Sequence, residues 1–302
     1  MNSNQMTRRG LLTIAGAALA GSVGVRPVSA AAPGVRFGVR TPLPKKSLRD
    51  LALMVKDIGY DGIELARDWY AQGYATAQPV EELQKQLDGT GIVVSAIIGS
   101  IDLLDVDPAK RAKAIETDRQ RLLMAKALKT ERMNEVPVFG PPQFQDLSPV
   151  MNVREIEERL LIASLKELAS DVEASGVTLM LEPCNRKETH FMNRQGQAAK
   201  IIEAVGSPKI GILSDFYHMQ LEEPSIPEAL ARYGKYTCYV HLADGEKRTE
   251  PGSLPFDYRP GFHELKKWGY SGWLTMESGF TDTPEAALAR ALKYIKQQWA
   301  EA

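Results

Sequence analysis

VREIEERLLIASLKELASDVEASGVTLMLE, residues 153–182, contains the unit from which the fold is built. Apolar residues recur at three- and four-residue spacing in its first part, as on one face of a helix, and Gly176 follows as a helix-ending residue. Residues 178–181 are a short apolar run typical of a buried strand, and Glu182 comes directly after it. A buried carboxylate is costly unless something pairs with it. The stretch therefore predicts a helix, then a strand, then a carboxylate with a function.

The same alternation of strand and helix continues along the chain. The expected strands are residues 35–40, 62–65, 92–98, 131–137, 178–182, 210–215, 237–241 and 272–277. Strands that alternate with helices indicate an α/β fold with a parallel sheet, and eight such units predict a (β/α)8 TIM barrel as a single domain over residues 31–302. An open doubly wound sheet is the alternative. It usually has a glycine-rich phosphate loop after its first strand, where this chain has FGVRTPLP instead.

Residues 1–30 are predicted to be a signal peptide outside the fold. A charged start precedes an apolar, small-residue segment, and the final VSA resembles a cleavage site. Arg8 and Arg9 resemble the twin-arginine export signal, and residues 11–25 are too short and too rich in glycine and alanine for a good membrane span. We expect the twin-arginine export machinery as a partner, a periplasmic or otherwise exported location, and no stable membrane anchor after cleavage. A general secretory signal or an uncleaved anchor is the alternative.

The charges of the chain are nearly balanced. There are 37 Lys and Arg against 38 Asp and Glu, for a net charge of −1, so nothing draws the chain to nucleic acid or an anionic membrane and we expect no nucleic-acid partner. Cys184 and Cys238 fall on expected strands that are not neighbours. Two free thiols are therefore expected rather than a disulfide.

Four polar side chains end four of the expected strands. The segments LMLE, ILSD, CYVH and LTME end in Glu182, Asp215, His241 and Glu277. In a TIM barrel these ends lie on one rim, which carries the active site. Any one of these residues alone would more often be an ion pair, a helix cap or a core histidine. Together, three carboxylates and one imidazole predict a site for one divalent ion: Mn²⁺ first, with Co²⁺, Mg²⁺ or Zn²⁺ as alternatives.

The segments around these residues carry a family resemblance. LEPCNRKETHFMN, LSDFYHMQLEE, HLADGEKRTEPG and GYSGWLTMESG resemble the xylose isomerase-like TIM barrel superfamily of sugar phosphate isomerases and epimerases. Within it the chain is most similar to ketose 3-epimerases of the tagatose/psicose type and to hydroxypyruvate isomerases. The resemblance implies the same four metal ligands. It further implies that Glu188, His218 and Arg248 hold the sugar, with Lys247 as the alternative to Arg248 because this loop is one residue longer than usual.

The resemblance also implies a mechanism. Glu182 and Glu277 form the acid/base pair: one removes a proton beside the carbonyl of a ketose or keto-sugar, a metal-stabilised enediolate forms, and the other returns a proton to the opposite face. Return of the proton to the neighbouring carbon gives isomerisation instead. The expected function is a metal-dependent sugar isomerase or epimerase with a small carbohydrate substrate, with a homo-oligomer left open.

Three other functions are alternatives. A lyase or dehydratase acting on a keto-sugar, keto-inositol or 3-keto-glycoside shares the first step, and the residues do not separate it from an epimerase. A DNA-repair endonuclease of the same superfamily needs three ions and further histidines from early strands, but this chain has four histidines and none before His190. A non-catalytic sugar-binding protein is disfavoured because both acid/base glutamates are present.

The polar residues that remain receive plainer expectations. Asn185, Arg186 and His190 are expected to brace the loop that follows the first ligand. Glu64, at the end of the second strand, is expected either to reach the pocket or to pair with Arg67.

Overall fold

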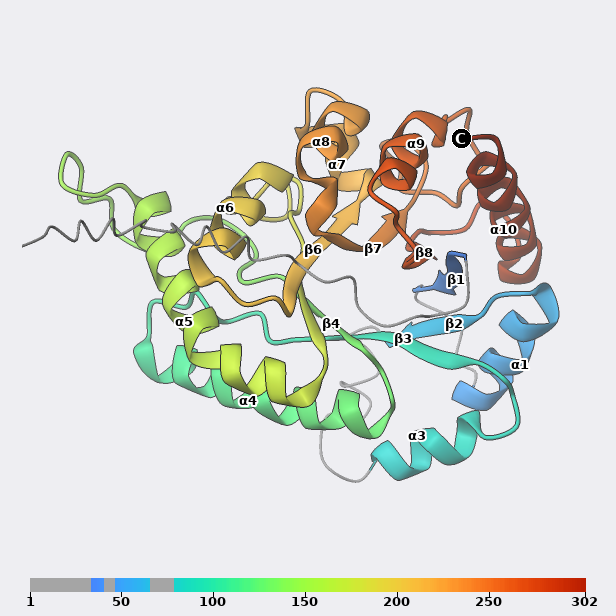
Figure 1. The fold of residues 1–302 in the computed structure, drawn as a ribbon, viewed down its shortest axis with the longest axis horizontal. Coiled ribbons are helices and arrows are strands. Elements are labelled where there is room, and N and C mark those ends of the chain that lie inside the picture. The colour runs from blue at the N-terminus through green and yellow to red at the C-terminus, as the bar shows by residue number, and fades with distance from the viewer. Residues whose placement is uncertain (1–33, 41–46, 66–78) are drawn as a thin grey trace, which may run out of the picture. The chain divides into compact units, whose positions relative to one another are not determined.

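The apolar segments of the sequence form a closed barrel of eight parallel strands in the computed structural model, which describes residues 34–40, 47–65 and 79–302 (Figure 1). The strands are β1 (Arg36–Val39), β2 (Gly62–Leu65), β3 (Val93–Ile98), β4 (Arg132–Glu135), β5 (Thr178–Leu181), β6 (Ile210–Asp215), β7 (Thr237–Leu242) and β8 (Trp273–Met276). Each strand pairs with the next, and β8 pairs with β1. The predicted (β/α)8 TIM barrel is therefore confirmed. The predicted signal peptide lies outside the described residues.

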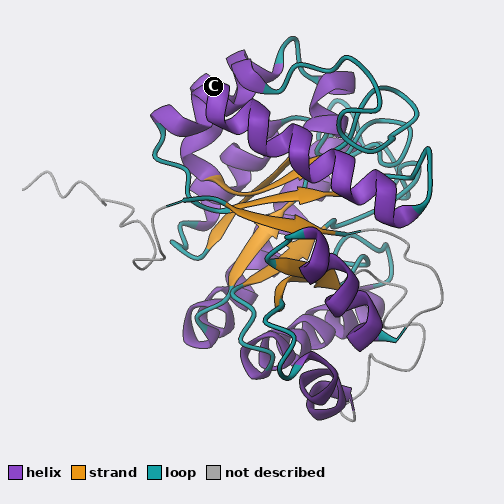
Figure 2. Cartoon of the chain, turned by 90° about the vertical axis from the view of Figure 1, so that its right-hand side faces the viewer, coloured by secondary structure: helices purple, strands orange, loops and turns teal. Residues whose placement is uncertain are grey.

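Helices surround the strands on the outside of the barrel (Figure 2). They are α1 (Leu48–Ile58), α3 (Pro79–Leu87), α4 (Pro108–Ala127), α5 (Val153–Ser175), α6 (Gln195–Val205), α7 (Phe216–Glu222), α8 (Ile226–Tyr233), η2 (Gly234–Tyr236), α9 (Arg259–Lys267) and α10 (Pro284–Glu301). Local sequence sets their ends. In α5, Asn152 and Glu155 form a capping box at the start, and Gly176 ends the helix with φ of 77°.

The two-residue period of a strand places an interior side chain beneath each residue of the rim. Met180, Leu213 and Tyr239 lie two positions before Glu182, Asp215 and His241, and with Ala96 and Trp273 they form a buried cluster inside the barrel. Because successive strand residues alternate between the two faces, the same backbone that fills the interior also directs the site residues into the barrel mouth. The polar residues of the rim therefore lie directly above a layer of buried side chains in the barrel interior.

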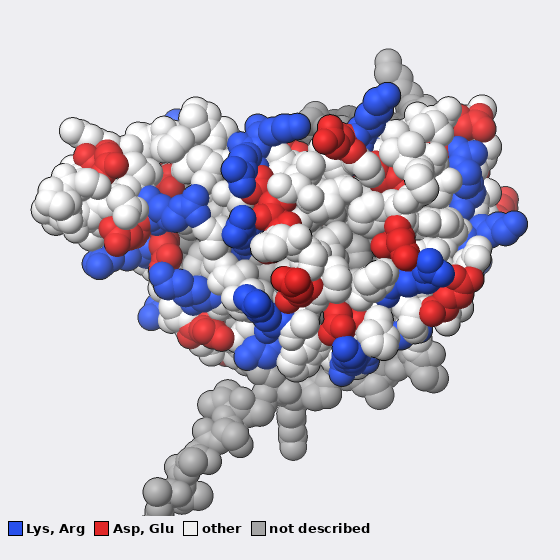
Figure 3. Space-filling view, turned by 90° about the horizontal axis from the view of Figure 1, so that it is seen from above, with Lys and Arg blue, Asp and Glu red and all other residues white. Residues whose placement is uncertain are grey.

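Charged side chains of both signs lie on the face of the molecule drawn in Figure 3. Figure 3 shows acidic and basic side chains interspersed over one face of the molecule, as the nearly balanced sequence charge leads one to expect. Among the described helices, none combines the length and the apolar character that crossing a membrane would require.

Candidate metal and active site

The four residues predicted to bind a metal converge at one end of the barrel. Glu182 follows β5, Asp215 ends β6, His241 lies in β7 and Glu277 follows β8. One ligand atom from each residue lies within 4.8 Å of the others. Glu182, Asp215 and His241 are buried, and the side chain of Glu277 is 14% exposed. The structure therefore brings together all four, while their role as ligands stays a prediction.

The donor atoms of this cluster fit a divalent cation. His241 Nδ1 and Glu277 Oε2 lie 2.6 Å apart; both are buried and neither makes a hydrogen bond of good geometry among the described residues, although Arg248 Nη2 forms an ion pair with Glu277 Oε2 at 2.9 Å. Buried polar atoms are rarely left in this condition because they lose their hydration. A cation between them would satisfy both. Three carboxylates and one imidazole suit Mn²⁺, Co²⁺, Mg²⁺ or Zn²⁺.

Glu64 holds the far side of the His241 ring. Its Oε2 lies 2.7 Å from His241 Nε2, and both side chains are fully buried. The guanidinium of Arg40, at the end of β1, contacts Glu64 at 3.0 Å and also contacts Glu277. A carboxylate behind a metal-facing imidazole fixes its orientation and tautomer. Of the two alternatives for Glu64, the structure places it in the pocket, whereas Arg67 lies outside the described residues.

Asn134 of β4 is a site residue that sequence reasoning missed. Its Nδ2 donates a hydrogen bond of 2.5 Å to Glu182 Oε2, and the residue is buried. The sequence did contain a signal for this residue, because RMNE is unusually polar for a strand inside a barrel. That polarity is explained by an amide that faces the site.

Charge coupling within the cluster shifts two pKa values. Burial opposes the charge of Glu182, but hydrogen bonding and charge from His241 outweigh it and hold the pKa of Glu182 well below its usual range. Burial also opposes the charge of His241, but Glu64 and Glu182 together raise the pKa of His241 to about 9. His241 therefore binds a proton tightly, and a metal ion that binds to its Nδ1 must displace that proton.

Arg248 reaches the same cluster from the loop after β7. Its Nη2 lies 2.8 Å from Asp215 Oδ2 and 2.9 Å from Glu277 Oε2, and its guanidinium lies over the Tyr217 ring at 4.6 Å. The backbone of Arg248 has φ of 52°, a left-handed conformation that is costly for a residue other than glycine. Lys247 is exposed to solvent. The structure thus directs Arg248, the first choice from the sequence, into the site.

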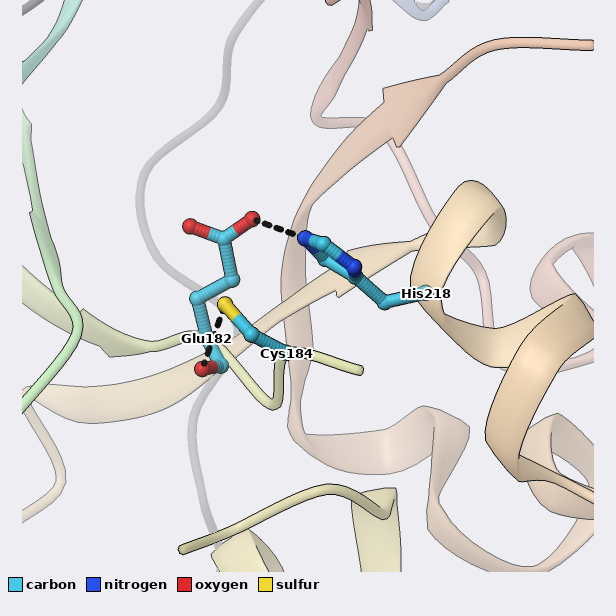
Figure 4. Close-up of side chains that lie close together, drawn as sticks. All are labelled: Glu182, Cys184 and His218. Carbon is cyan, nitrogen blue, oxygen red and sulfur yellow. Dashed lines mark hydrogen bonds and ion pairs between the residues drawn. The ribbon is translucent and has the colours of Figure 1, made fainter. Parts of the chain in front are cut away.

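His218 presents an N–H group to the site. The backbone N–H of Asn185 donates to His218 Nδ1 at 3.2 Å, so Nδ1 accepts and Nε2 carries the hydrogen. Nε2 faces Glu182 at 3.8 Å (Figure 4). It also lies 3.4 Å from Asp215 Oδ2. Cys184 lies beside them, and burial raises the pKa of its thiol. Glu182, Cys184 and His218 lie close enough together to be considered as a second metal site. The N–H at His218 Nε2 and the S–H of Cys184 instead suit hydrogen bonds donated to a substrate oxygen.

The remaining expectations can be checked directly. Arg186 pairs with the buried Glu222 at 2.7 Å, and His190 pairs with Glu157 at 2.6 Å, so the loop after β5 is braced by these side chains. Both cysteines are free thiols, as predicted.

Several known proteins are similar to this chain. A family model described as xylose isomerase-like TIM barrel matches residues 53–298. The 3-dehydro-D-guloside 4-epimerase of Escherichia coli (strain K12) is 27% identical over 80% of this chain and 91% of that protein. A probable ketose 3-epimerase of Synechocystis sp. is 25% identical over 87% of this chain and 91% of that protein. A solved D-psicose 3-epimerase with D-tagatose, from Clostridium cellulolyticum H10, has a TM-score of 0.74 at 20% identity, covering 88% of this chain and 99% of that one.

These similarities bear on fold and class in different ways. The solved structure supports the fold alone at its level of identity. The curated relatives are epimerases, which confirms the predicted enzyme class, an isomerase or epimerase. The family model spans most of the sequence and confirms the resemblance seen in the four motifs. This chain belongs to the xylose isomerase-like TIM barrel family.

Proposed function

We propose that this protein is a metal-dependent epimerase or isomerase of a keto-sugar. The observation that carries the proposal is the convergence of Glu182, Asp215, His241 and Glu277 within 4.8 Å at the mouth of the barrel. The names of the relatives refer to a 3-dehydroglycoside and to free ketoses. We propose a sugar that carries a ketone, either as a 3-dehydroglycoside or as a free ketose, as the substrate.

Glu182 and Glu277 are the proposed acid/base pair. They approach the site from β5 and β8, which are not adjacent in the barrel. A bound divalent ion, Mn²⁺ by preference, would polarise the substrate carbonyl. Ionised Glu182 takes the proton from the carbon beside the carbonyl, and the C–H electron pair moves toward the carbonyl oxygen as an enediolate. Protonated Glu277 then gives its proton to the opposite face, which inverts the centre; in the reverse reaction the two roles exchange.

Three further side chains are proposed to hold the sugar. The Nε2–H of His218 donates to a substrate oxygen, and the Arg248 guanidinium offsets negative charge as it develops on oxygen. Glu188, whose side chain is 35% exposed, accepts from a sugar hydroxyl. The 3.6 Å approach of Arg248 Nη1 to Glu188 Oε1 supports a shared role.

Proton exchange tests this proposal. Metal-loaded protein is incubated with 3-dehydroglycosides and ketoses in deuterated water. Deuterium at the carbon beside the carbonyl, together with an epimer or aldose, supports it. An unsaturated or cleaved product would instead establish the lyase alternative, which the epimerase relatives do not favour. Absence of exchange on every substrate would refute the shared first step.

Two variants separate catalysis from sugar binding. Glu182→Gln and Glu277→Gln are expected to lose exchange and turnover, because an amide cannot serve as the base or acid. Metal content is measured in each, since both residues are also proposed ligands. His263→Ala, which removes an exposed imidazole of α9, is the matched control and should retain activity. Full turnover in both glutamine variants would contradict the assignment.

We also propose that the protein is exported. The support is the sequence of residues 1–30 alone, with its paired arginines and apolar segment. Fractionation of cells that express the full chain tests the location.

A further inference from the structure

We propose that the His190–Glu157 pair positions Glu188 for sugar binding, which makes His190 a positioning residue of the active site. The inference rests on the proposed function, in which Glu188 accepts a hydrogen bond from the sugar. His190 lies in the loop after β5, two residues beyond Glu188, and Glu157 lies in the first turns of α5. Neither residue contacts the metal cluster.

The His190 side chain joins three segments of the chain. Its Nε2 lies 2.6 Å from Glu157 Oε1 of α5, and its Nδ1 lies 2.8 Å from the carbonyl oxygen of Gly140. The side chain of His190 is 16% exposed and that of Glu157 is 1% exposed. A single imidazole therefore links the loop after β5 to the loop after β4 and to the helix that follows it.

Gly140, which the His190 ring contacts, also holds the backbone of Glu188. The N–H of Gly140 donates to the carbonyl oxygen of Glu188 at 2.7 Å, and the N–H of His190 donates to the carbonyl oxygen of Gly140 at 3.1 Å. Gly140 has φ of 81°, a conformation that glycine adopts without steric cost. The two backbone hydrogen bonds hold the chain on either side of Thr189. The His190 ring adds a third contact, from its Nδ1 to the Gly140 carbonyl oxygen. A shift of His190 would therefore move the backbone of Glu188.

The side chain of Glu188 is directed to the site from this fixed backbone. Asn185 Nδ2 donates to Glu188 Oε1 at 2.9 Å, and Arg248 Nη1 approaches the same oxygen at 3.6 Å. Because a carboxylate on a loop samples many positions, its value for binding depends on how firmly its backbone is held. The His190–Glu157 pair supplies that support from the outer side of the loop.

The chemistry of the pair defines an informative substitution. The Gly140 carbonyl can only accept, so His190 Nδ1 carries a hydrogen, and a second hydrogen lies between Nε2 and Glu157 Oε1. Burial raises the pKa of Glu157, which favours the retention of that hydrogen. In Glu157→Gln the amide donates to Nε2 while Nδ1–H still reaches Gly140. In Glu157→Leu the volume remains but the partner of Nε2 is lost.

Steady-state kinetics on the metal-loaded full chain test the inference. Glu157→Leu should raise KM for the keto-sugar about tenfold with kcat changed less than about threefold, because the loss of a buried hydrogen bond loosens binding without touching the acid/base pair. Glu157→Gln should stay within about twofold of the parent in KM. Affinity for Mn²⁺ should be the same in all three proteins. Amide hydrogen exchange in residues 136–141 and 183–191 should be faster in Glu157→Leu alone.

Two kinetic results would contradict the positioning role of His190. Equal KM values in the leucine and glutamine variants, or a fall in kcat at constant KM, would overturn the positioning role. Should Glu157→Leu fail to fold, Arg154→Ala replaces it: this exposed guanidinium donates to the His190 carbonyl at 3.2 Å, and its loss should raise KM in the same direction. An unchanged KM there overturns the inference. If the parent protein shows no deuterium exchange with any keto-sugar, the proposed function has failed instead, and hydrogen exchange of the two loops still reports on the pair.

Discussion

Metal binding should release a proton from His241, and its affinity should depend steeply on pH. Glu64 and Glu182 raise the pKa of His241 from 6.5 to about 9 in the metal-free cluster. Below that pKa the imidazole holds a proton that the incoming ion must displace, whereas above it the ring is free to bind. Apparent affinity should therefore rise tenfold per pH unit up to about pH 9. At pH 7 it should lie about 100-fold, or about 2.7 kcal/mol, below its plateau.

Glu64→Gln separates proton competition from ligand support. The amide oxygen can still accept from His241 Nε2–H at the 2.7 Å contact, but the neighbouring charge is gone and the pKa of His241 should fall toward 6.5. The variant also loses a carboxylate behind the ligand, which typically weakens metal binding about 10–100-fold. The parent should thus exceed the variant by that factor at pH 9. The ratio should fall about 100-fold between pH 9 and pH 6, to below unity, because proton competition then weakens binding by the parent far more than by the variant.

The assay is a Mn²⁺ titration of metal-free protein at pH 6, 7, 8 and 9. Calorimetry in two buffers of different ionisation enthalpy gives both the affinity and the number of protons released. Glu157→Gln is the matched control, since it makes the same change at a buried glutamate that contacts a histidine outside the metal cluster. A parent affinity that is flat between pH 6 and 8, or binding without proton release, would refute the reasoning.

Three shorter predictions concern the packing of Gly62 against Trp273, the predicted signal peptide and the two cysteine thiols. Gly62→Ala would place its Cβ 2.5 Å from the Trp273 ring, so the free energy of unfolding should fall by about 1–3 kcal/mol, seen as a lower Tm; an unchanged Tm would show that the indole moves freely. Replacing Arg8 and Arg9 by lysine should leave the uncleaved protein in the cytoplasm of fractionated cells; continued export would point to the general secretory route. Cys184 is buried, which raises the pKa of its thiol, so a thiol reagent should label Cys184 only after denaturation, whereas Cys238 is half-buried; prompt labelling of Cys184 in the native protein would contradict its burial.

The parts of the site that the sequence predicted are those governed by strand periodicity. Glu182, Asp215, His241 and Glu277 each stand at a strand end, and parallel strands in one barrel bring such ends to one rim whatever the details of register. The strands other than β4 could be located for the same reason, since each is a short, largely apolar run followed by a helical pattern. The bounds of β2 and β6 match the expected ranges, β7 extends one residue farther, and the other strands are shorter than expected, β4 most of all, because an apolar run alone does not show where pairing ends.

The supporting contacts depend on how the barrel closes, which no local pattern reveals. Glu64 meets His241 from the opposite side of the interior, and it directly follows a register shift in the β2–β3 pairing. Such a shift re-aims the side chains that follow it. Asn134 reaches Glu182 because β4 and β5 pair in register. Arg40 was missed because an arginine at a strand end has many possible partners in a sequence, whereas among the described residues it pairs with Glu64 and Glu277.

The closing seam of the barrel pairs its first strand with its last. β1 pairs with β8 over four register positions, from Arg36 and Trp273 to Val39 and Met276, but with β2 over only two. During synthesis the first strand must therefore wait for the last one before it gains most of its ladder, and such long-range pairing is slow. A ribosome that stops early leaves β1 without its main partner. The barrel can therefore close only after β8 has been synthesised.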